Sequence, residues 1–150
     1  MTEKSKISYH LYKEKSATTS YSEKVFIILD MIPKWRDIKE ALQREGKLSR
    51  IDALYIIRTA TKIMRAEPNI MNLSDPVTVV GDLHGQFYDL LKVIDIGGNP
   101  ESVKYLFLGD YVDRGVFSCE VILLLYSIKV MHLSDQFPIY YRANERKSRM

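Results

Sequence analysis

The sequence predicts an α/β fold in which a strand–helix–strand–helix–strand (βαβαβ) core follows two helices. Short apolar, β-rich runs alternate with amphipathic helical stretches from residue 77 onward, and two amphipathic stretches precede the first run. This alternation implies right-handed parallel crossovers with helices covering the sheet. The length of 150 residues corresponds to about one domain, and the apolar content of 46% supplies a core large enough to exclude wholesale disorder.

The N-terminal third of the chain divides into an arm and a helical region. Residues 1–24 are rich in charged, serine and threonine side chains. That composition cannot bury enough apolar surface to offset the entropy of ordering, so we expect a flexible arm at 1–24 and one structured unit over 25–150. A first helix is predicted from Lys34, because Pro33 suits a first helical position and Gly46 can end the helix in the left-handed conformation.

The remaining elements follow from periodicity. A second helix is predicted to begin at Ser49, with Asp52 as its capping-box partner, and to end at Pro68. Strands and two further helices are then expected at 77–80 (strand), 87–94 (helix), 105–108 (strand), 121–128 (helix) and 137–141 (strand). The third strand is the least regular of these, because Pro138 removes a donor from the ladder.

Composition narrows the class of protein. The 22 basic and 19 acidic residues leave a net charge of +3, too small to predict a nucleic-acid surface. The longest strongly apolar stretch, 121–130, contains Ser127 and Lys129 and is shorter than the about 20 residues of a membrane span. We expect no secretory signal, because no apolar run follows the first residues. The lone Cys119 cannot form an intrachain disulfide, so we expect a reducing, cytoplasmic compartment, with Cys119 and Trp35 in the core.

Two of the predicted strands end in the same Gly-Asp dipeptide, in the segments GDLHG at 81–85 and GDYVDRG at 109–115. Neighbouring parallel strands lie about 4.8 Å apart and present their carboxyl ends at one edge of the sheet, so Asp82 and Asp110 should emerge side by side. Carboxylates this close repel each other unless they share a proton or a cation, and His84 adds a nitrogen ligand. The flanking glycines let the backbone turn sharply and let another group approach closely.

This set of side chains predicts a metal site. Mixed carboxylate and imidazole ligands suit Mn, Fe or Zn better than calcium. An aspartate at a strand end can also cap the following helix, but two Gly-Asp pairs together with His84 and an Asp-Arg-Gly run favour a metal site over capping alone. The residues leave two alternatives open. The metal site could act on the phosphate esters of nucleotides or nucleic acid, or the chain could be a non-catalytic fragment that binds partners.

The segments 81–85 and 109–115 resemble the first two signatures of the phosphoprotein (Ser/Thr) phosphatase family. The runs before them, at 75–80 and 105–108, and the two helices from residue 45 onward resemble the calcineurin catalytic subunits within that family. The resemblance covers roughly residues 34–145, or about the first half of a catalytic domain. It implies a partial αββα metallophosphatase sandwich that hydrolyses phosphoserine and phosphothreonine esters.

The resemblance also implies ligands and cofactors. Asp82 and His84 would bind a first metal ion, Asp110 would bridge two ions, and Asn144 would be a ligand of the second ion. Two divalent or trivalent ions, Fe/Zn or Mn, are the implied cofactors. Cations held a few ångströms apart neutralise the charge that develops on phosphoryl oxygens, which agrees with these roles.

The resemblance assigns catalytic roles to two further residues and shows one departure. Arg114 would hold the phosphate oxygens of the substrate, a task that suits its planar guanidinium, and Asp113 would orient a catalytic histidine. That histidine follows the asparagine in the third family signature, Arg-Gly-Asn-His-Glu, whereas this chain reads RANER at 142–146. Losing a positioned acid typically costs about 10²–10⁴ in rate, so we expect little turnover from the isolated chain.

The implied partners are a phosphoprotein substrate, a calcium-binding regulatory subunit and calmodulin. The main binding segments for the last two, and two later metal-binding histidines of the family, have no counterpart in the 150 residues. We therefore expect either a phosphatase gene product that is cut short or an incomplete gene model. No nucleic-acid or membrane partner is expected.

Overall fold

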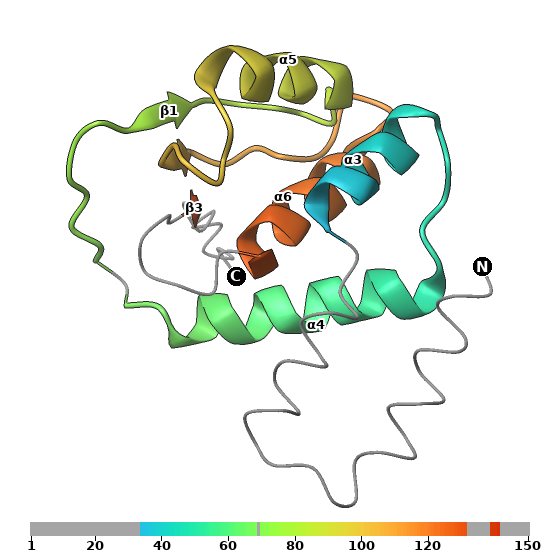
Figure 1. Cartoon of the computed structure of the whole chain (residues 1–150), viewed down its shortest axis with the longest axis horizontal. Coiled ribbons are helices and arrows are strands. Elements are labelled where there is room, and N and C mark those ends of the chain that lie inside the picture. The colour runs from blue at the N-terminus through green and yellow to red at the C-terminus, as the bar shows by residue number, and fades with distance from the viewer. Residues whose placement is uncertain (1–33, 69, 132–138, 142–150) are drawn as a thin grey trace, which may run out of the picture.

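A computed structural model describes residues 34–68, 70–131 and 139–141. The predicted arm at 1–24, the start of the structured unit at 25, Pro33 and Asn144 lie outside the described residues. In chain order and with the labels of Figure 1, the elements are α3 (Trp35–Gln43), α4 (Arg50–Ala66), β1 (Thr78–Val80), α5 (Phe87–Gly97), β2 (Tyr105–Phe107), α6 (Ser118–Met131) and β3 (Ile139–Tyr141). This order confirms the predicted βαβαβ core and the two helices before it.

The three strands form one parallel sheet in the order β1-β2-β3. Thr78 pairs with Tyr105, and Tyr105 pairs with Ile139, so corresponding residues of the three strands lie in register. The ladder continues past the strands, because the Leu108 N–H donates to the Val80 carbonyl at 2.9 Å. The carboxyl ends of β1 and β2 therefore lie at the same edge of the sheet, as predicted.

Helix α6 is the centre of the helical packing. It contacts α3, α4 and α5, and Figure 1 shows it between α4 on one side and α5 with the sheet on the other. Four of its side chains, Val121, Leu124, Leu125 and Ile128, are buried in one core cluster with side chains of α3, α4, α5, β1 and β2. Among the described residues, none of the helices combines the length and the apolar character that a membrane span requires. The buried Lys129 of α6 forms an ion pair with Glu67 at the end of α4.

The start of α4 confirms the predicted cap. The Asp52 N–H donates to Ser49 Oγ at 3.1 Å, and Ser49 Oγ donates to the Asp52 carboxylate at 2.6 Å. The predicted role of Gly46 is wrong, because the left-handed residue after α3 is Glu45, with φ of 55°. Gly46 is needed for space instead: a Cβ there would lie 2.8 Å from the carbonyl oxygen of Ala41, which accepts the Gly46 N–H.

Trp35 and Cys119 were both predicted to lie in the core, and the structure confirms only one of the two predictions. Trp35 is only 4% exposed, which confirms its place in the core. Cys119 is exposed, so the prediction that it lies in the core is wrong. The reason is helical geometry, because Cys119 lies about 200° around α6 from Val121, whose side chain is fully buried.

Candidate metal centre

The loops that leave β1 and β2 are joined to each other by their backbones. The N–H groups of Leu83 and His84 both donate to the Asp110 carbonyl, at 3.1 and 2.7 Å. One residue further on, the Gly85 N–H donates to the Tyr111 carbonyl at 2.9 Å. The side chains of the two loops are therefore placed by backbone pairing that extends beyond the sheet.

Three predicted ligand residues lie together at this edge. One ligand atom from each of Asp82, His84 and Asp110 lies within 4.8 Å of the other two, and Nε2 of His84 is 3.6 Å from an Asp82 carboxylate oxygen. His84 is largely covered, with its side chain 20% exposed, whereas the Asp82 side chain is 64% exposed. The expected juxtaposition of residues 82 and 110 is confirmed, and their assignment as metal ligands stays a prediction.

The orientation of His84 fits a metal ion. Its Nδ1 lies 3.1 Å from the Val112 carbonyl oxygen, which can only accept a hydrogen bond. Nδ1 therefore carries the proton, and in the neutral ring Nε2 presents a lone pair toward the carboxylates of Asp82 and Asp110. A cation between the three groups would satisfy lone pairs that otherwise repel one another. A backbone carbonyl on the remote ring nitrogen is also the usual arrangement around a metal-bound histidine.

Backbone strain is concentrated in these two loops. Of the five non-glycine residues with positive φ in the described part of the chain, four lie here: His84 at 43°, Asp110 at 47°, Asp113 at 69° and Arg114 at 61°. Left-handed conformations are unfavourable for residues with a Cβ and persist only where surrounding contacts impose them, often at functional sites. The strain thus coincides with the residues that the sequence singles out.

The other predicted site residues are not part of the three-residue cluster. Asp113 and Arg114 lie on the β2 loop and are exposed. Within the described residues, the Arg114 guanidinium has no carboxylate partner, so its donors are available to an anion. Asn144, the predicted ligand of a second ion, lies outside the described residues. The structure therefore assembles one three-residue cluster, with Asp113 and Arg114 following on the same loop.

Two contributors to the site were missed by sequence reasoning. The Val112 carbonyl orients His84, and the packing of Gly85 against Gly115 brings the two loops together. The signal for the glycines was present, because their type indicates that something approaches closely. The sequence did not reveal that each glycine is approached by the other loop.

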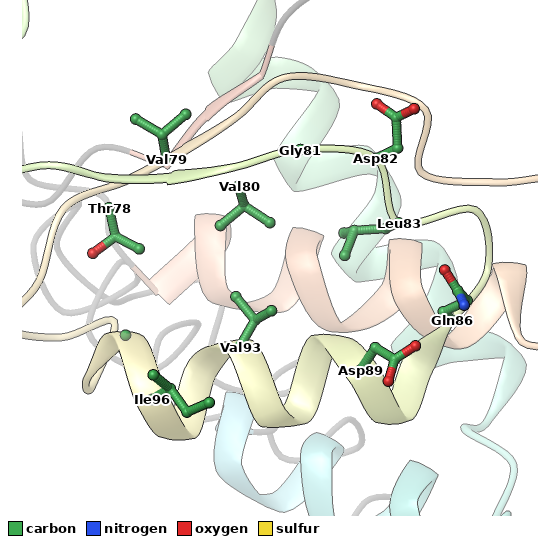
Figure 2. A pocket seen from close by; sticks show the side chains of 11 residues that line it. Thr78, Val79, Val80, Gly81, Asp82, Leu83, Gln86, Asp89, Val93 and Ile96 are labelled. Carbon is green, nitrogen blue, oxygen red and sulfur yellow. The ribbon is translucent and has the colours of Figure 1, made fainter.

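A groove of about 370 Å³ lies beside the cluster, between β1 and α5. Figure 2 shows Val80 of β1 and Val93 of α5 pointing toward each other across it, while the Asp82 carboxylate points away from α5. The groove is thus lined mainly by apolar side chains near Asp82. Asp82 belongs to both the groove and the cluster, whereas His84 and Asp110 do not line the groove.

Comparisons with known proteins agree with this geometry. Residues 75–141 match the family model of calcineurin-like phosphoesterases. These residues contain all three strands and both Gly-Asp loops. The chain therefore carries part of a calcineurin-like metallophosphatase domain, and divalent metal ions are the cofactors that this family implies.

The relatives narrow the assignment. The chain is 47% identical over 106 residues to serine/threonine-protein phosphatase 2B catalytic subunit A2 of Saccharomyces cerevisiae, a match that covers 71% of this chain and 17% of the relative. It is 45% identical over 111 residues to subunit A1 of the same organism, covering 74% of this chain and 20% of the relative. The predicted resemblance to the calcineurin group of serine/threonine phosphatases is confirmed. The chain spans only about a fifth of these relatives.

A solved structure shares the fold. It is a protein serine/threonine phosphatase from Saccharomyces cerevisiae with similarity to human phosphatase PP5, and it is 39% identical in sequence to this chain. The TM-score is 0.54, and the match covers 61% of this chain and 31% of the solved one. The predicted fold class, part of a metallophosphatase sandwich, is therefore confirmed.

Proposed function

We propose that this chain supplies the first metal ligands and the phosphate-binding arginine of a calcineurin-type protein phosphatase, which hydrolyses phosphoserine and phosphothreonine esters. The observation that carries the proposal is the convergence of ligand atoms from Asp82, His84 and Asp110 within 4.8 Å. The identity to phosphatase 2B catalytic subunits supports the reaction class. We propose the phosphatase activity of these relatives for this chain because the sequences are similar, although the chain covers only about a fifth of their length.

The proposed ligands follow from the donor set. Asp82 and His84 would hold the first ion through a carboxylate oxygen and a ring nitrogen, and Asp110 would serve both ions. Asn144 completes the proposed set as a ligand of the second ion. Oxygen and imidazole donors favour Mn, or an Fe/Zn pair, as the ions. When bound, such ions act as Lewis acids on the phosphoryl group and activate water at neutral pH.

The protein residues have separate tasks. The Arg114 guanidinium binds the phosphate oxygens of the substrate by bidentate hydrogen bonds, which its lack of a described carboxylate partner permits. Asp113 follows Asp110 on the same loop and is suited to orient a proton donor. The family supplies that donor from the residue after the asparagine, where this chain has Glu145. We therefore expect slow protonation of the leaving alcohol and low turnover.

Partners and compartment are also proposals. The homologues imply phosphoprotein substrates and regulatory partners in general. A calcium-binding regulatory subunit and calmodulin are the specific partners to test, and the cytoplasm is the compartment that the single cysteine favours.

Calorimetric titration of Mn²⁺ into the full 150-residue chain tests the proposal. We expect saturable binding by the wild type and at least tenfold weaker binding by Asp110→Asn, because an amide replaces the shared carboxylate. Asparagine tolerates positive φ, so this variant keeps the loop conformation. Asp89→Asn, which alters an acidic residue of the groove outside the cluster, is the matched control and should bind like the wild type.

Hydrolysis of a phosphoserine peptide with Mn²⁺ present tests the second part of the proposal. Low turnover that disappears in Asp110→Asn agrees with the expected loss of the acid. Absence of any Mn²⁺ binding by the wild-type chain contradicts the metal site. Robust turnover that Asp110→Asn abolishes contradicts the expected low rate while supporting the site.

A further inference from the structure

Two glycines, one from each Gly-Asp loop, meet backbone to backbone beside the candidate metal centre. A Cβ built on Gly115 would lie 2.3 Å from the His84 carbonyl oxygen and 2.7 Å from the Gly85 carbonyl carbon. A Cβ built on Gly85 would lie 2.7 Å from both the Gly115 carbonyl oxygen and Ser118 Oγ. Neither position has space for a side chain, because the nearest neighbours include backbone atoms that cannot rotate away.

The two glycines differ in why glycine is required. Gly85 has φ of 71°, so its conformation as well as its surroundings disfavour a side chain. Gly115 is not among the residues with positive φ, so its requirement is for space alone. Gly115 is therefore the position at which a side chain tests the contact without also changing the preferred backbone conformation.

Hydrogen bonds fix the His84–Gly85 unit between two parts of the β2 loop. On one side, the His84 N–H donates to the Asp110 carbonyl at 2.7 Å. On the other side, the Gly115 N–H donates to the His84 carbonyl at 2.7 Å, and the Phe117 N–H donates to the Gly85 carbonyl at 3.2 Å. The backbone of His84 therefore has little freedom to move relative to that loop.

The side chain of His84 depends on the same loop. Its Nδ1 binds the Val112 carbonyl, three residues before Gly115, and this bond determines which ring nitrogen faces Asp82. A methyl group on Gly115 would have to move about 1 Å to reach ordinary contact with the His84 carbonyl oxygen. A displacement of that size would break the bond between Nδ1 and Val112, which starts from 3.1 Å, since hydrogen bonds are lost beyond about 3.5 Å.

We propose that Gly115 is a positioning residue for the candidate metal centre: its lack of a side chain lets the β2 loop lie against His84 and so directs Nε2 toward Asp82 and Asp110. The proposal rests on the metal role of His84 proposed above. Gly115 itself provides no ligand atom. Its effect on metal affinity is transmitted entirely through His84.

The first experiment measures Mn²⁺ affinity of Gly115→Ala by calorimetry, at a temperature where circular dichroism shows each variant to be folded. We expect about 10–100-fold weaker binding, the usual effect of losing a group that orients a ligand. Gly81→Ala is one control, because Gly81 precedes Asp82 but has nothing within 4 Å of its added Cβ. Gly46→Ala is the other, with a comparably crowded site near Ala41 and away from the centre. Both should bind within about twofold of the wild type.

A double-mutant cycle separates positioning from a general loss of stability. If Gly115 acts through His84, adding Gly115→Ala to His84→Ala should weaken Mn²⁺ binding no further than His84→Ala alone. A merely structural role predicts that the two losses add. Additive losses, or wild-type affinity in Gly115→Ala, would overturn the proposal.

A metal-free measurement distinguishes this proposal from the proposed function. At pH 8, nitrogen NMR of the His84 ring should show the proton on Nδ1 in the wild type and a mixture of tautomers in Gly115→Ala. If the wild type binds no Mn²⁺, the proposed metal site fails, and the tautomer still reports on positioning. An unchanged tautomer in Gly115→Ala overturns the positioning role.

If Gly115→Ala does not fold, amide hydrogen exchange of the wild type tests the contact between Gly115 and His84. The amides of His84 and Gly115 belong to one hydrogen-bonded unit, so they should exchange with the same opening free energy. A Gly115 amide that exchanges freely while the His84 amide stays protected would show that the contact is not formed in solution, and would overturn the proposal.

Discussion

Nδ1 of His84 lies 3.1 Å from the carbonyl oxygen of Val112, a residue of the other Gly-Asp loop. This single hydrogen bond fixes the tautomer of the imidazole and turns Nε2 toward the carboxylates of Asp82 and Asp110. The bond is possible because the loops after β1 and β2 are paired through their backbones. The orientation of the His84 side chain on one loop is thus determined by the Val112 carbonyl of the other loop.

Metal binding should stabilise the chain. Mn²⁺ at 100 times its Kd adds about 2.7 kcal/mol to the free energy of unfolding, since only the folded chain brings the three ligands together. For 150 residues, this corresponds to an increase in Tm on the order of 5–10 °C. Differential scanning fluorimetry checks it, with His84→Ala expected to lose the increase and Asp89→Asn to keep it. An equal increase in His84→Ala would place the bound ion elsewhere.

The positions of Asp82 and Asp110 in the candidate metal centre could be predicted from the sequence, because they follow from where the two strands end. Parallel pairing of β1 with β2 brings Asp82 and Asp110 to the same edge, because Asp82 lies two residues after the end of β1 and Asp110 three residues after the end of β2. The orientation of His84 could not be predicted, because it depends on a backbone carbonyl whose position follows from the left-handed residues of the β2 loop. No side-chain pattern reports where a carbonyl will point.

The same distinction explains the errors in the fold. Periodicity located the helices because burial of an apolar stripe is a property of the sequence itself. The end of α3 depended on which of two adjacent residues took the left-handed conformation, and Glu45 rather than Gly46 does so, while Gly46 is crowded by the Ala41 carbonyl. Cys119 was misplaced because residue type favours burial, whereas its position on α6 directs it outward.

Removal of the α4 cap should destabilise the chain. Ser49→Ala eliminates the acceptor for the Asp52 N–H and the hydroxyl that binds the Asp52 carboxylate. We expect a loss of about 1 kcal/mol in the free energy of unfolding, measured by urea denaturation. Thr61→Ala is the matched control, because its hydroxyl bonds to the Ile57 carbonyl inside the same helix, and its loss should be near zero or slightly stabilising. Equal effects of the two variants would contradict the assigned cap.

Two ion pairs of different burial should differ in their effect on stability. The Lys129 side chain is 4% exposed and pairs with Glu67, which is 24% exposed. Glu67→Ala leaves a buried ammonium without this carboxylate, so we expect a loss on the order of 3 kcal/mol in urea denaturation. Glu40→Ala breaks the exposed pair with Arg44 on α3 and should cost less than about 0.5 kcal/mol. A Glu67→Ala loss as small as that of Glu40→Ala would contradict the assignment of Glu67 as the main stabilising partner of the Lys129 ammonium.

The contact between α3 and the segment before β2 should weaken in acid. The Trp35 indole N–H donates to the Glu101 carboxylate at 2.9 Å, and Arg36 binds both of its oxygens, at 2.6 and 2.9 Å. The Trp35 hydrogen bond, followed by that of Arg36, lowers the pKa of Glu101 below its ordinary value of 4.5. The folded chain therefore binds the proton less readily than the unfolded chain does. The stabilisation is fully present above pH 4.5 and decreases as the pH falls through the lowered pKa.

Thermal unfolding between pH 7 and pH 3 tests this contact. At pH 7, Glu101→Gln should melt at a lower temperature than the wild type, because the amide loses the charge-assisted bonds to Trp35 and Arg36. As the pH falls through the lowered pKa of Glu101, the wild-type carboxyl becomes neutral as well, so the difference in Tm should shrink toward zero. Asp37→Asn, a neighbouring acid in the first turn of α3, is the control and should not reproduce this convergence. A Tm difference that stays constant with pH would contradict a charged Glu101 as the source of the stabilisation.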